Sequence, residues 1–168
     1  MSTLRKDKTG AEIEIRLIHP DDEGRLRFFY EGLSDETIRS FYRVTGRREY
    51  FIQRSVIIQE CNVDLKEHLY MVAIHDDEIV GLETLIRTDM PSEYEISHLI
   101  SDEYQSRGIG SILMEETLSY VRKYWRRHFT ITAETALSNY KAKGFMKKFG
   151  FAVKNSERGE ISWVYKIS

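Results

Sequence analysis

The chain has 168 residues, and its hydrophobic share of 41% and charged share of 31% are typical of a globular protein with a buried core. Its formal net charge of −2 argues against a duplex-DNA-binding protein, which would normally carry a strong basic excess. A single cysteine, Cys61, excludes an intrachain disulfide and suggests no metal cluster, and no apolar run is long enough to predict a signal peptide or a membrane helix.

The first half of the chain predicts one strand followed by helices. Apolar residues alternate with polar ones until Pro20, which removes a backbone donor and ends the strand. Asp21 and Asp22 then suit the capping position of a first helix, and Ser34 suits the start of a second. The expected elements are a strand over residues 12–18 and helices over residues 21–33, 34–42 and 47–60.

The second half predicts a sheet with helices packed on it. Residues 68–75 are apolar on both faces, which is typical of a central strand, and residues 76–78 turn the chain into an antiparallel hairpin. The helix after Gly108 carries a broad apolar stripe. The expected elements are strands over residues 68–75, 79–87, 93–101 and 129–133, helices over 109–125 and 138–148, and a last hairpin formed by 152–155 and 161–167.

The turn from Tyr104 to Gly110 is the strongest indication of a ligand site. It lies between an expected strand and an expected helix, so it directs unpaired backbone N–H groups and the positive end of the helix dipole at one point. That point suits a phosphate or a pyrophosphate, and Gly108 and Gly110 let the backbone approach it closely. The spacing Gln-x-x-Gly-x-Gly differs from those of dinucleotide binders and nucleotide-hydrolysing loops.

This spacing resembles the acyl-CoA signature of the GNAT acetyltransferase superfamily. Asn139 and the helix that ends at Gly150 are similar to the second motif of that family. Residues 15–22 and 33–42 resemble the GNAT domain of bacterial and archaeal protein-lysine acetyltransferases. The resemblance covers residues 13–167 and implies a mixed α/β fold, with a mostly antiparallel central sheet of six to seven strands and helices on both faces. We expect a single N-acetyltransferase domain over residues 1–168.

The resemblance implies acetyl-CoA as cosubstrate and no bound metal. Backbone N–H groups of the glycine turn should hold the pyrophosphate, and the charge of Arg107 should reach a phosphate. Backbone groups of Leu99 and Ile100 should pair with the pantetheine arm. Asn139 should contact the same arm, and it equally suits the N-cap of its helix. The expected cofactor-binding residues are Leu99, Ile100, Gln105, Ser106, Arg107, Gly108, Ile109, Gly110 and Asn139.

Acetyl transfer to lysine needs a general base, because the amine has a pKa of about 10.4 and only about one molecule in a thousand is neutral at pH 7.4. By resemblance to the lysine acetyltransferases, this base is Glu95. Strand parity leaves Glu93 open, because members of the superfamily carry a bulge in this strand, and His98 is a third candidate. Many members also carry a tyrosine acid where this chain has Met146, so the acid of the reaction stays open.

The sequence favours an N-acetyltransferase in which a primary amine attacks acetyl-CoA directly. A protein lysine is preferred as acceptor over a small amine or a polyamine, and the resemblance implies a lysine on an acyl-CoA synthetase or another metabolic enzyme. The alternative is a non-catalytic acyl-CoA-binding or sensor module. We expect a cytoplasmic monomer or homodimer with neither a nucleic-acid nor a membrane partner.

A group of arginines accompanies the second and third expected helices. They form either a lip that receives an acidic partner or ordinary solvated helix faces. They are Arg39, Arg43, Arg47, Arg48 and Arg54.

Overall fold

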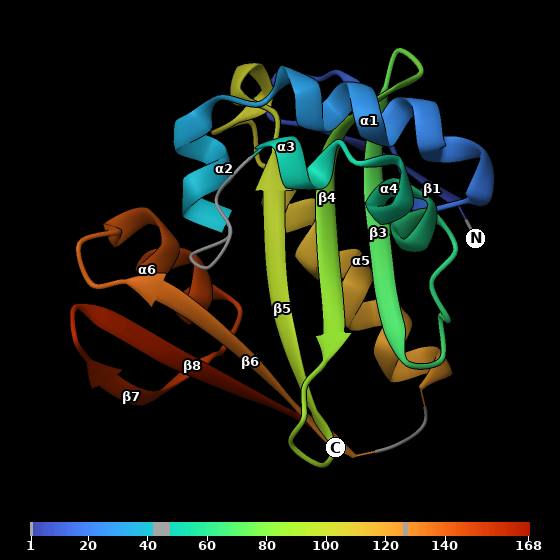
Figure 1. Ribbon diagram of the computed structural model, residues 1–168. Coiled ribbons are helices and arrows are strands. Elements are labelled where there is room, and N and C mark those ends of the chain that lie inside the picture. Colours follow the sequence, from blue (N-terminus) through green and yellow to red (C-terminus); the bar gives the residue numbers. More distant parts are fainter. Residues whose placement is uncertain (1, 42–47, 126–127) are drawn as a thin grey trace.

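The computed structural model describes residues 2–41, 48–125 and 128–168, in which eight strands form one sheet (Figure 1). The strands are β1 (Ser2–Lys6), β2 (Glu12–Leu17), β3 (His68–His75), β4 (Glu78–Arg87), β5 (Glu93–Ile100), β6 (Phe129–Ala136), β7 (Ala152–Glu157) and β8 (Glu160–Ile167). The helices are α1 (Glu23–Gly32), α2 (Asp35–Phe41), α3 (Arg48–Phe51), α4 (Arg54–Cys61), α5 (Ile109–Tyr124) and α6 (Tyr140–Lys148), with short 3-10 turns η1 (Pro20–Asp22) and η2 (Asp102–Tyr104). The strand order is β1-β2-β3-β4-β5-β6-β8-β7, and every neighbouring pair is antiparallel except β5 with β6.

Helices cover both faces of the sheet, and each face has its own apolar cluster. α5 and α6 pack on one face, the α5 face, where Leu113, Met146 and Trp163 are buried. α1 to α4 pack on the other, the α1 face, around Tyr30 and Phe51. Figure 1 shows α5 passing behind the strands, with α1 to α4 on the viewer's side. The helices on both faces that the resemblance implied are therefore confirmed.

The two halves of the sheet separate between β5 and β6. These parallel strands pair at only three positions, from Glu93 opposite Thr130 to Glu95 opposite Thr132. Beyond Glu95, β5 stays paired with β4 as far as Ile100, whereas β6 stays paired with β8. The two strands diverge toward their carboxyl ends (Figure 1) and leave an opening in the sheet with Glu95 at its apex. Ligands of open α/β sheets commonly bind beyond the carboxyl ends of the strands, so this opening positions a site.

The predicted mixed α/β fold is confirmed, with one strand more than the six to seven expected. The strand that we did not expect is β1, whose alternation is hidden by charged residues and whose apolar Leu4 is 68% exposed. It pairs only with β2, at the edge of the sheet. An edge strand needs no buried face to be held by backbone hydrogen bonds, so its side chains give little periodic signal.

The single helix expected over residues 47–60 is wrong. Two short helices, α3 and α4, occupy this region, and between them Gln53 has an extended ψ of 130°. The predicted helix positions at Tyr42 and Arg47 lie outside the described residues. None of the helices within the described ranges is both long and apolar enough to cross a membrane.

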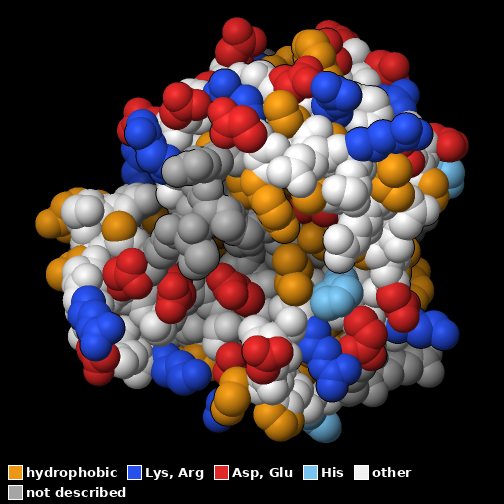
Figure 2. Space-filling view, viewed as in Figure 1, with side chains coloured by type: hydrophobic (Ala, Val, Ile, Leu, Met, Phe, Trp, Pro, Cys, Tyr) orange, Lys and Arg blue, Asp and Glu red, His pale blue; other side chains and the backbone are white. Residues whose placement is uncertain are grey.

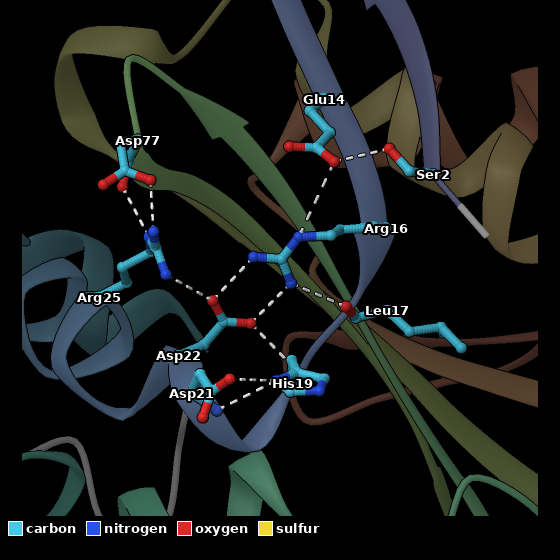
Figure 3. A network of polar contacts seen from close by, with 9 residues as sticks. All are labelled: Ser2, Glu14, Arg16, Leu17, His19, Asp21, Asp22, Arg25 and Asp77. Carbon is cyan, nitrogen blue, oxygen red and sulfur yellow. Dashed lines mark hydrogen bonds and ion pairs between the residues drawn. The ribbon is translucent and has the colours of Figure 1, made fainter.

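A buried ion pair ties the start of α1 to β2 (Figure 3). Arg16 donates from Nη1 and Nη2 to the two carboxyl oxygens of Asp22, at 2.6 and 2.8 Å. Asp22 also accepts the N–H of His19 at 2.8 Å, so its carboxylate does not cap α1 as the sequence suggested. Arg25 lies 3.3 Å from the same carboxylate and reaches onward to Asp77 in the turn between β3 and β4. This network fixes the N-terminal part of the chain to the sheet.

Candidate functional site

The glycine turn has the strand–turn–helix context that the sequence predicts. β5 ends at Ile100, η2 follows, and α5 begins at Ile109. Gly108 occupies the N-cap position with φ of +89°, a left-handed conformation that a residue without Cβ adopts readily. No described side chain caps α5. The N–H of Ser111 donates to Gly108 O at 3.1 Å, whereas those of Ile109 and Gly110 are left for an external acceptor. With the helix dipole added, this end of α5 suits an anion.

Arg107 lies in this turn, but its guanidinium contacts the loop between β1 and β2. Its Nε donates to Asp7 Oδ2 at 2.6 Å, its Nη2 donates to Thr9 Oγ1 at 3.1 Å, and it lies 4.4 Å from the centroid of the Tyr104 ring. Burial would raise the pKa of Asp7, but hydrogen bonds led by those of Thr9 outweigh burial and lower it to about 2. The ionised carboxylate neutralises the guanidinium. A contact between Arg107 and a phosphate stays a prediction, and this ion pair opposes it.

The turn is also fastened to α2. Asp102 accepts hydrogen bonds from Ser34 N and Oγ at 2.9 and 2.7 Å, and from Thr37 Oγ1 at 2.7 Å. Burial alone would raise the pKa of Asp102, but these hydrogen bonds lower it. Gln105 Nε2 donates to Thr37 Oγ1 at 3.1 Å and to Ile100 O at 3.3 Å. The side-chain amide of Gln105 is thereby directed into the protein, and its backbone N–H donates to Asp102 O at 3.4 Å.

The pairing of β5 decides which face its side chains occupy. Residues 94–100 pair with β4 without a register shift, so the bulge expected in this strand does not occur along this pairing. Ile96 is buried on the α5 face, whereas Leu99 is buried on the α1 face. Because side chains alternate along a strand, Glu93 and Glu95 both lie on the α1 face.

Of these two carboxylates, Glu95 lies at the opening of the sheet. It is the last residue of β5 that pairs with β6, and its side chain is exposed. Glu93 lies two residues further back, where the strands are still paired, and its carboxylate is 3.5 Å from Lys154 Nζ of β7. The geometry favours Glu95 over Glu93 as the group that meets an incoming amine.

His98 points to the opposite face, toward α5 and α6. Its ring centroid is 4.8 Å from that of Phe145, and a Cβ added to Gly110 would lie 3.6 Å from its Cδ2. Burial lowers the pKa of His98 to about 4, so the imidazole is neutral at pH 7 and less basic than an ordinary histidine. Both its position and its weak basicity argue against His98 as the base.

A second carboxyl, which sequence reasoning missed, lies beside His98. Glu83 of β4 is directly opposite His98 in the pairing, so both side chains are on the α5 face. Glu83 is fully buried, and neither of its oxygens has a hydrogen-bond partner among the described residues; the hydroxyl of the neighbouring Thr117 donates to Met71 Sδ instead. Burial raises the pKa of Glu83 to about 8. An acidic residue in the middle of a mostly apolar strand was the signal available in the sequence.

Asn139 lies on the side of the opening that is formed by β6, opposite the glycine turn. Because β5 and β6 are parallel, the segment after β6 lies at the same edge of the sheet as the glycine turn after β5. Asn139 Oδ1 accepts the N–H of Ala142 at 3.0 Å, so its expected role as N-cap of α6 is confirmed. Lys148 Nζ donates to Ser111 Oγ at 3.1 Å, which joins α6 to α5.

The backbone of β5 beside the opening includes the two residues expected to pair with pantetheine. Ser101 donates its N–H to Val80 O in β4, whereas Ile100 O accepts from Gln105. Because backbone groups alternate in direction along a strand, those of Leu99 face β4 and those of Ile100 face away from it. Contact with pantetheine stays a prediction for both residues, and this alternation favours Ile100.

The position at which many family members carry a tyrosine acid is part of the core here. Met146 is only 5% exposed, within the cluster of the α5 face. Tyr140 is 77% exposed at the start of α6, with Lys143 Nζ 4.0 Å from its ring centroid. Neither residue is therefore assigned as the acid.

The expected arginine lip is only partly described. Arg43 and Arg47 lie outside the described residues. Arg48 donates to Leu33 O and lies 3.0 Å from Asp35, so it joins α3 to the segment between α1 and α2. A role of these arginines in receiving a partner stays a prediction.

Comparison with known proteins gives one family and a set of similar folds. The profile of the acetyltransferase (GNAT) family matches residues 27–151. The GNAT domain of S. lividans PAT is similar in fold, with a TM-score of 0.83 and 22% identity, over 99% of this chain and 97% of that chain. No curated protein matches the chain in sequence.

Two further solved structures have similar folds. The ribosomal-protein-S5-alanine acetyltransferase from Vibrio fischeri has a TM-score of 0.78 and 17% identity, over 98% of this chain and 96% of that chain. PaiA N-acetyltransferase from Thermoplasma acidophilum, in complex with coenzyme A, has a TM-score of 0.69 and 19% identity, over 92% of this chain and 99% of that chain.

Proposed function

Because this chain belongs to the GNAT acetyltransferase family and is an acetyl-CoA-dependent N-acetyltransferase, we propose that residues 1–168 act as one domain that acetylates a lysine side chain of a protein. The observation that carries this proposal is the opening between β5 and β6. Glu95 lies at its apex on the α1 face. The glycine turn follows β5, on one side of the opening, and Asn139 follows β6, on the other side.

The cosubstrate is acetyl-CoA, and we assign its pyrophosphate to the glycine turn. Backbone N–H groups of residues 106–110 supply the donors, since that of Gln105 already donates to Asp102 O, and the left-handed Gly108 gives the turn its shape without a side chain in the way. The pantetheine arm then enters the opening between Ile100 on one side and Asn139 on the other. This placement uses main-chain groups of the turn, whose side chains the structure directs elsewhere.

In this arrangement Glu95 is the general base. An arriving lysine is protonated in water, and Glu95 takes a proton from the ammonium, directly or through a water molecule. The neutral amine then attacks the thioester carbonyl, and backbone N–H groups of β5 that face the opening stabilise the oxyanion. CoA leaves as a thiolate with an expected pKa near the ~8.5 of cysteine, so the reaction proceeds without the tyrosine acid.

Acidic side chains on the α1 face favour a cationic acceptor. Ala133 of β6 is buried on the α5 face, so its neighbour Glu134 lies on the α1 face, where it is exposed. Glu160 of β8 shares that face, because the adjacent Ile161 is buried on the other. Figure 2 shows several acidic side chains on this half of the molecule. Carboxylates on the face that an acceptor reaches attract an ammonium group more than a neutral amine.

A protein acceptor is also supported by comparison. The Vibrio fischeri enzyme of similar fold has a ribosomal protein in its name. The preference for a lysine over an alanine amine rests on residues 15–22 and 33–42, which resemble the protein-lysine acetyltransferases.

Glu95→Gln tests the base. We expect the variant to bind acetyl-CoA with wild-type affinity in a calorimetric titration, because the carboxylate is not part of the glycine turn. Its kcat toward a lysine-containing peptide should fall by about 10²-fold or more. Glu93→Gln is the matched control on the same face and should keep most of the activity. Equal activity of Glu95→Gln and wild type would remove Glu95 from the mechanism.

The acceptor is tested with three substrates and mass spectrometry. A lysine peptide with a blocked N-terminus, a lysine-free peptide with a free N-terminus, and spermidine separate the possible amines. Acetylation of the lysine peptide alone supports the proposal. A preference for the free N-terminus or for spermidine would mean that this amine, and not a protein lysine, is the acceptor. Binding of acetyl-CoA with no transfer to any amine would favour the non-catalytic sensor.

A further inference from the structure

We propose that Lys8, in the loop between β1 and β2, binds a phosphate of acetyl-CoA, and that Arg107 instead holds this loop in place. Lys8 has this role only if the cosubstrate lies at the glycine turn, as in the proposed function. The loop precedes residues 27–151, which match the family profile.

The β1–β2 loop is fastened to the glycine turn by backbone and side chain. Lys8 donates its N–H to Arg107 O at 2.9 Å. In return, Arg107 Nη2 lies 2.6 Å from the carboxylate of Asp7, whose side chain is completely buried. A second link is formed between β1 and α5, where Arg5 pairs with Glu116 at 2.6 Å. The loop is therefore held at a fixed position beside the N-terminus of α5.

The side chain of Lys8 lies along Gly108. Its Cγ and Cε are 3.3 and 3.4 Å from the position that a Cβ on Gly108 would take. The ammonium is one bond beyond Cε, so it lies close to the start of α5. Lys8 is exposed, and it takes part in none of the ion pairs of the described residues.

A cation at this position is unfavourable unless an anion joins it. The N-terminus of a helix carries a partial charge of about +0.5, which repels an ammonium group. A phosphate between the two is attracted by both and removes the repulsion. Arg107 adds no net charge, because Asp7 neutralises it. Of these two cations, Lys8 rather than Arg107 is therefore available to a phosphate.

Calorimetric titration of Lys8→Met with acetyl-CoA tests the proposal. We expect affinity to fall about tenfold, because a charge-assisted hydrogen bond to phosphate is lost. Lys8→Arg keeps the charge and should retain most of the affinity. Lys6→Met removes an exposed lysine two residues away on β1 and should bind as the wild type does. If Lys8→Met binds acetyl-CoA as tightly as the wild type, Lys8 has no such role, whereas the proposed function stands. Failure of the wild type to bind would overturn the proposed function itself.

Shorter ligands identify the phosphate and exclude an indirect effect. Dephospho-CoA lacks the 3′-phosphate, and pantetheine, measured by competition, lacks the pyrophosphate as well. A loss in Lys8→Met that persists with dephospho-CoA assigns Lys8 to the pyrophosphate, and a loss that disappears assigns it to the 3′-phosphate. An equal loss with pantetheine would mean that the substitution disturbs the turn, and it would overturn the proposal.

Discussion

Glu83 is a buried carboxyl that the folded protein keeps protonated at neutral pH. Burial raises its pKa to about 8, against about 4.3 in an unfolded chain. Between these two values the folded protein binds one proton more than the unfolded chain, so the stabilisation is complete below the lower value and is lost as the pH rises through the upper one. The free energy of unfolding should therefore fall across this window, by up to about 1.4 kcal/mol per pH unit.

Glu83→Gln should remove this pH dependence, because an amide of the same shape stays neutral. Urea unfolding at pH 6 and pH 8 measures this pH dependence. Between the two pH values, the free energy of unfolding of the variant should rise relative to that of the wild type. Glu157→Gln, exposed in β7, is the control and should follow the wild type. Parallel behaviour of wild type and Glu83→Gln between pH 6 and pH 8 would show that Glu83 does not titrate there.

Among the elements, the glycine turn depends on two glycines for different reasons. Gly108 has φ of +89°, and a Cβ there would lie 3.3 Å from Lys8 Cγ. Gly110 lies within α5, and a Cβ there would meet His98 Cδ2 at 3.6 Å, an ordinary contact. We expect Gly108→Ala to lower the free energy of unfolding by about 1 kcal/mol and to weaken acetyl-CoA binding, because the turn must change shape.

Gly110→Ala should keep the stability of the fold, because alanine is favoured over glycine inside a helix. Thermal unfolding and calorimetry on both variants separate the two cases. If Gly110→Ala loses as much stability as Gly108→Ala, the left-handed conformation is not what the turn requires of Gly108.

Elements with a strong local period could be predicted from the sequence. β3 begins and ends where its apolar run does, and α5 follows the apolar stripe that includes Leu113 and Leu118. The break at Gln53 was missed, because α3 and α4 each bury an apolar residue and together mimic one helix. β1 was missed because backbone hydrogen bonds hold an edge strand without a regular pattern of apolar side chains.

The candidate site divides in the same way. The glycine turn is a contiguous motif, so the sequence alone indicated its place between a strand and a helix, whereas Glu95 was proposed by resemblance with Glu93 and His98 left open. The ion pair of Asp7 with Arg107 joins residues 100 positions apart, and no local pattern specifies such a partner. The same holds for the divergence of β5 from β6, since each strand's periodicity tells which side chains are buried but not where the pairing between strands ends.

At the scale of the whole molecule, two of the ion pairs formed by the N-terminal segments lie in different parts of the fold. Asp7 with Arg107 joins the β1–β2 loop to the start of α5, and Asp22 with Arg16 joins α1 to β2. Only the first of these lies at the proposed cosubstrate site. The second is separated from the opening of the sheet by β3 and β4, so stability and function should respond differently to changes at the two places.

Asp22→Ala tests this separation. The carboxylate is 1% exposed and pairs with Arg16, so its removal leaves a mostly buried guanidinium with only the more distant Glu14, 4.0 Å away, as an ion-pair partner; it should cost up to about 3–5 kcal/mol of unfolding free energy (Figure 3). Asp77→Ala removes the 82% exposed end of the same network and should cost less than about 1 kcal/mol. Urea unfolding measures both, and kcat/KM at a temperature where Asp22→Ala is folded should match the wild type.

The pH dependence of the same pair gives a second measurement. Burial would raise the pKa of Asp22, but its hydrogen bonds with Arg16 outweigh burial and lower it, so the stabilisation is present above the ordinary carboxyl pKa and is lost as the pH falls below it. The stability gap between wild type and Asp22→Ala should therefore be wide at pH 7 and narrow in acid. A gap that is small at pH 7, or no larger than that of Asp77→Ala, would mean that apolar packing on the α1 face holds α1 to the sheet without this ion pair.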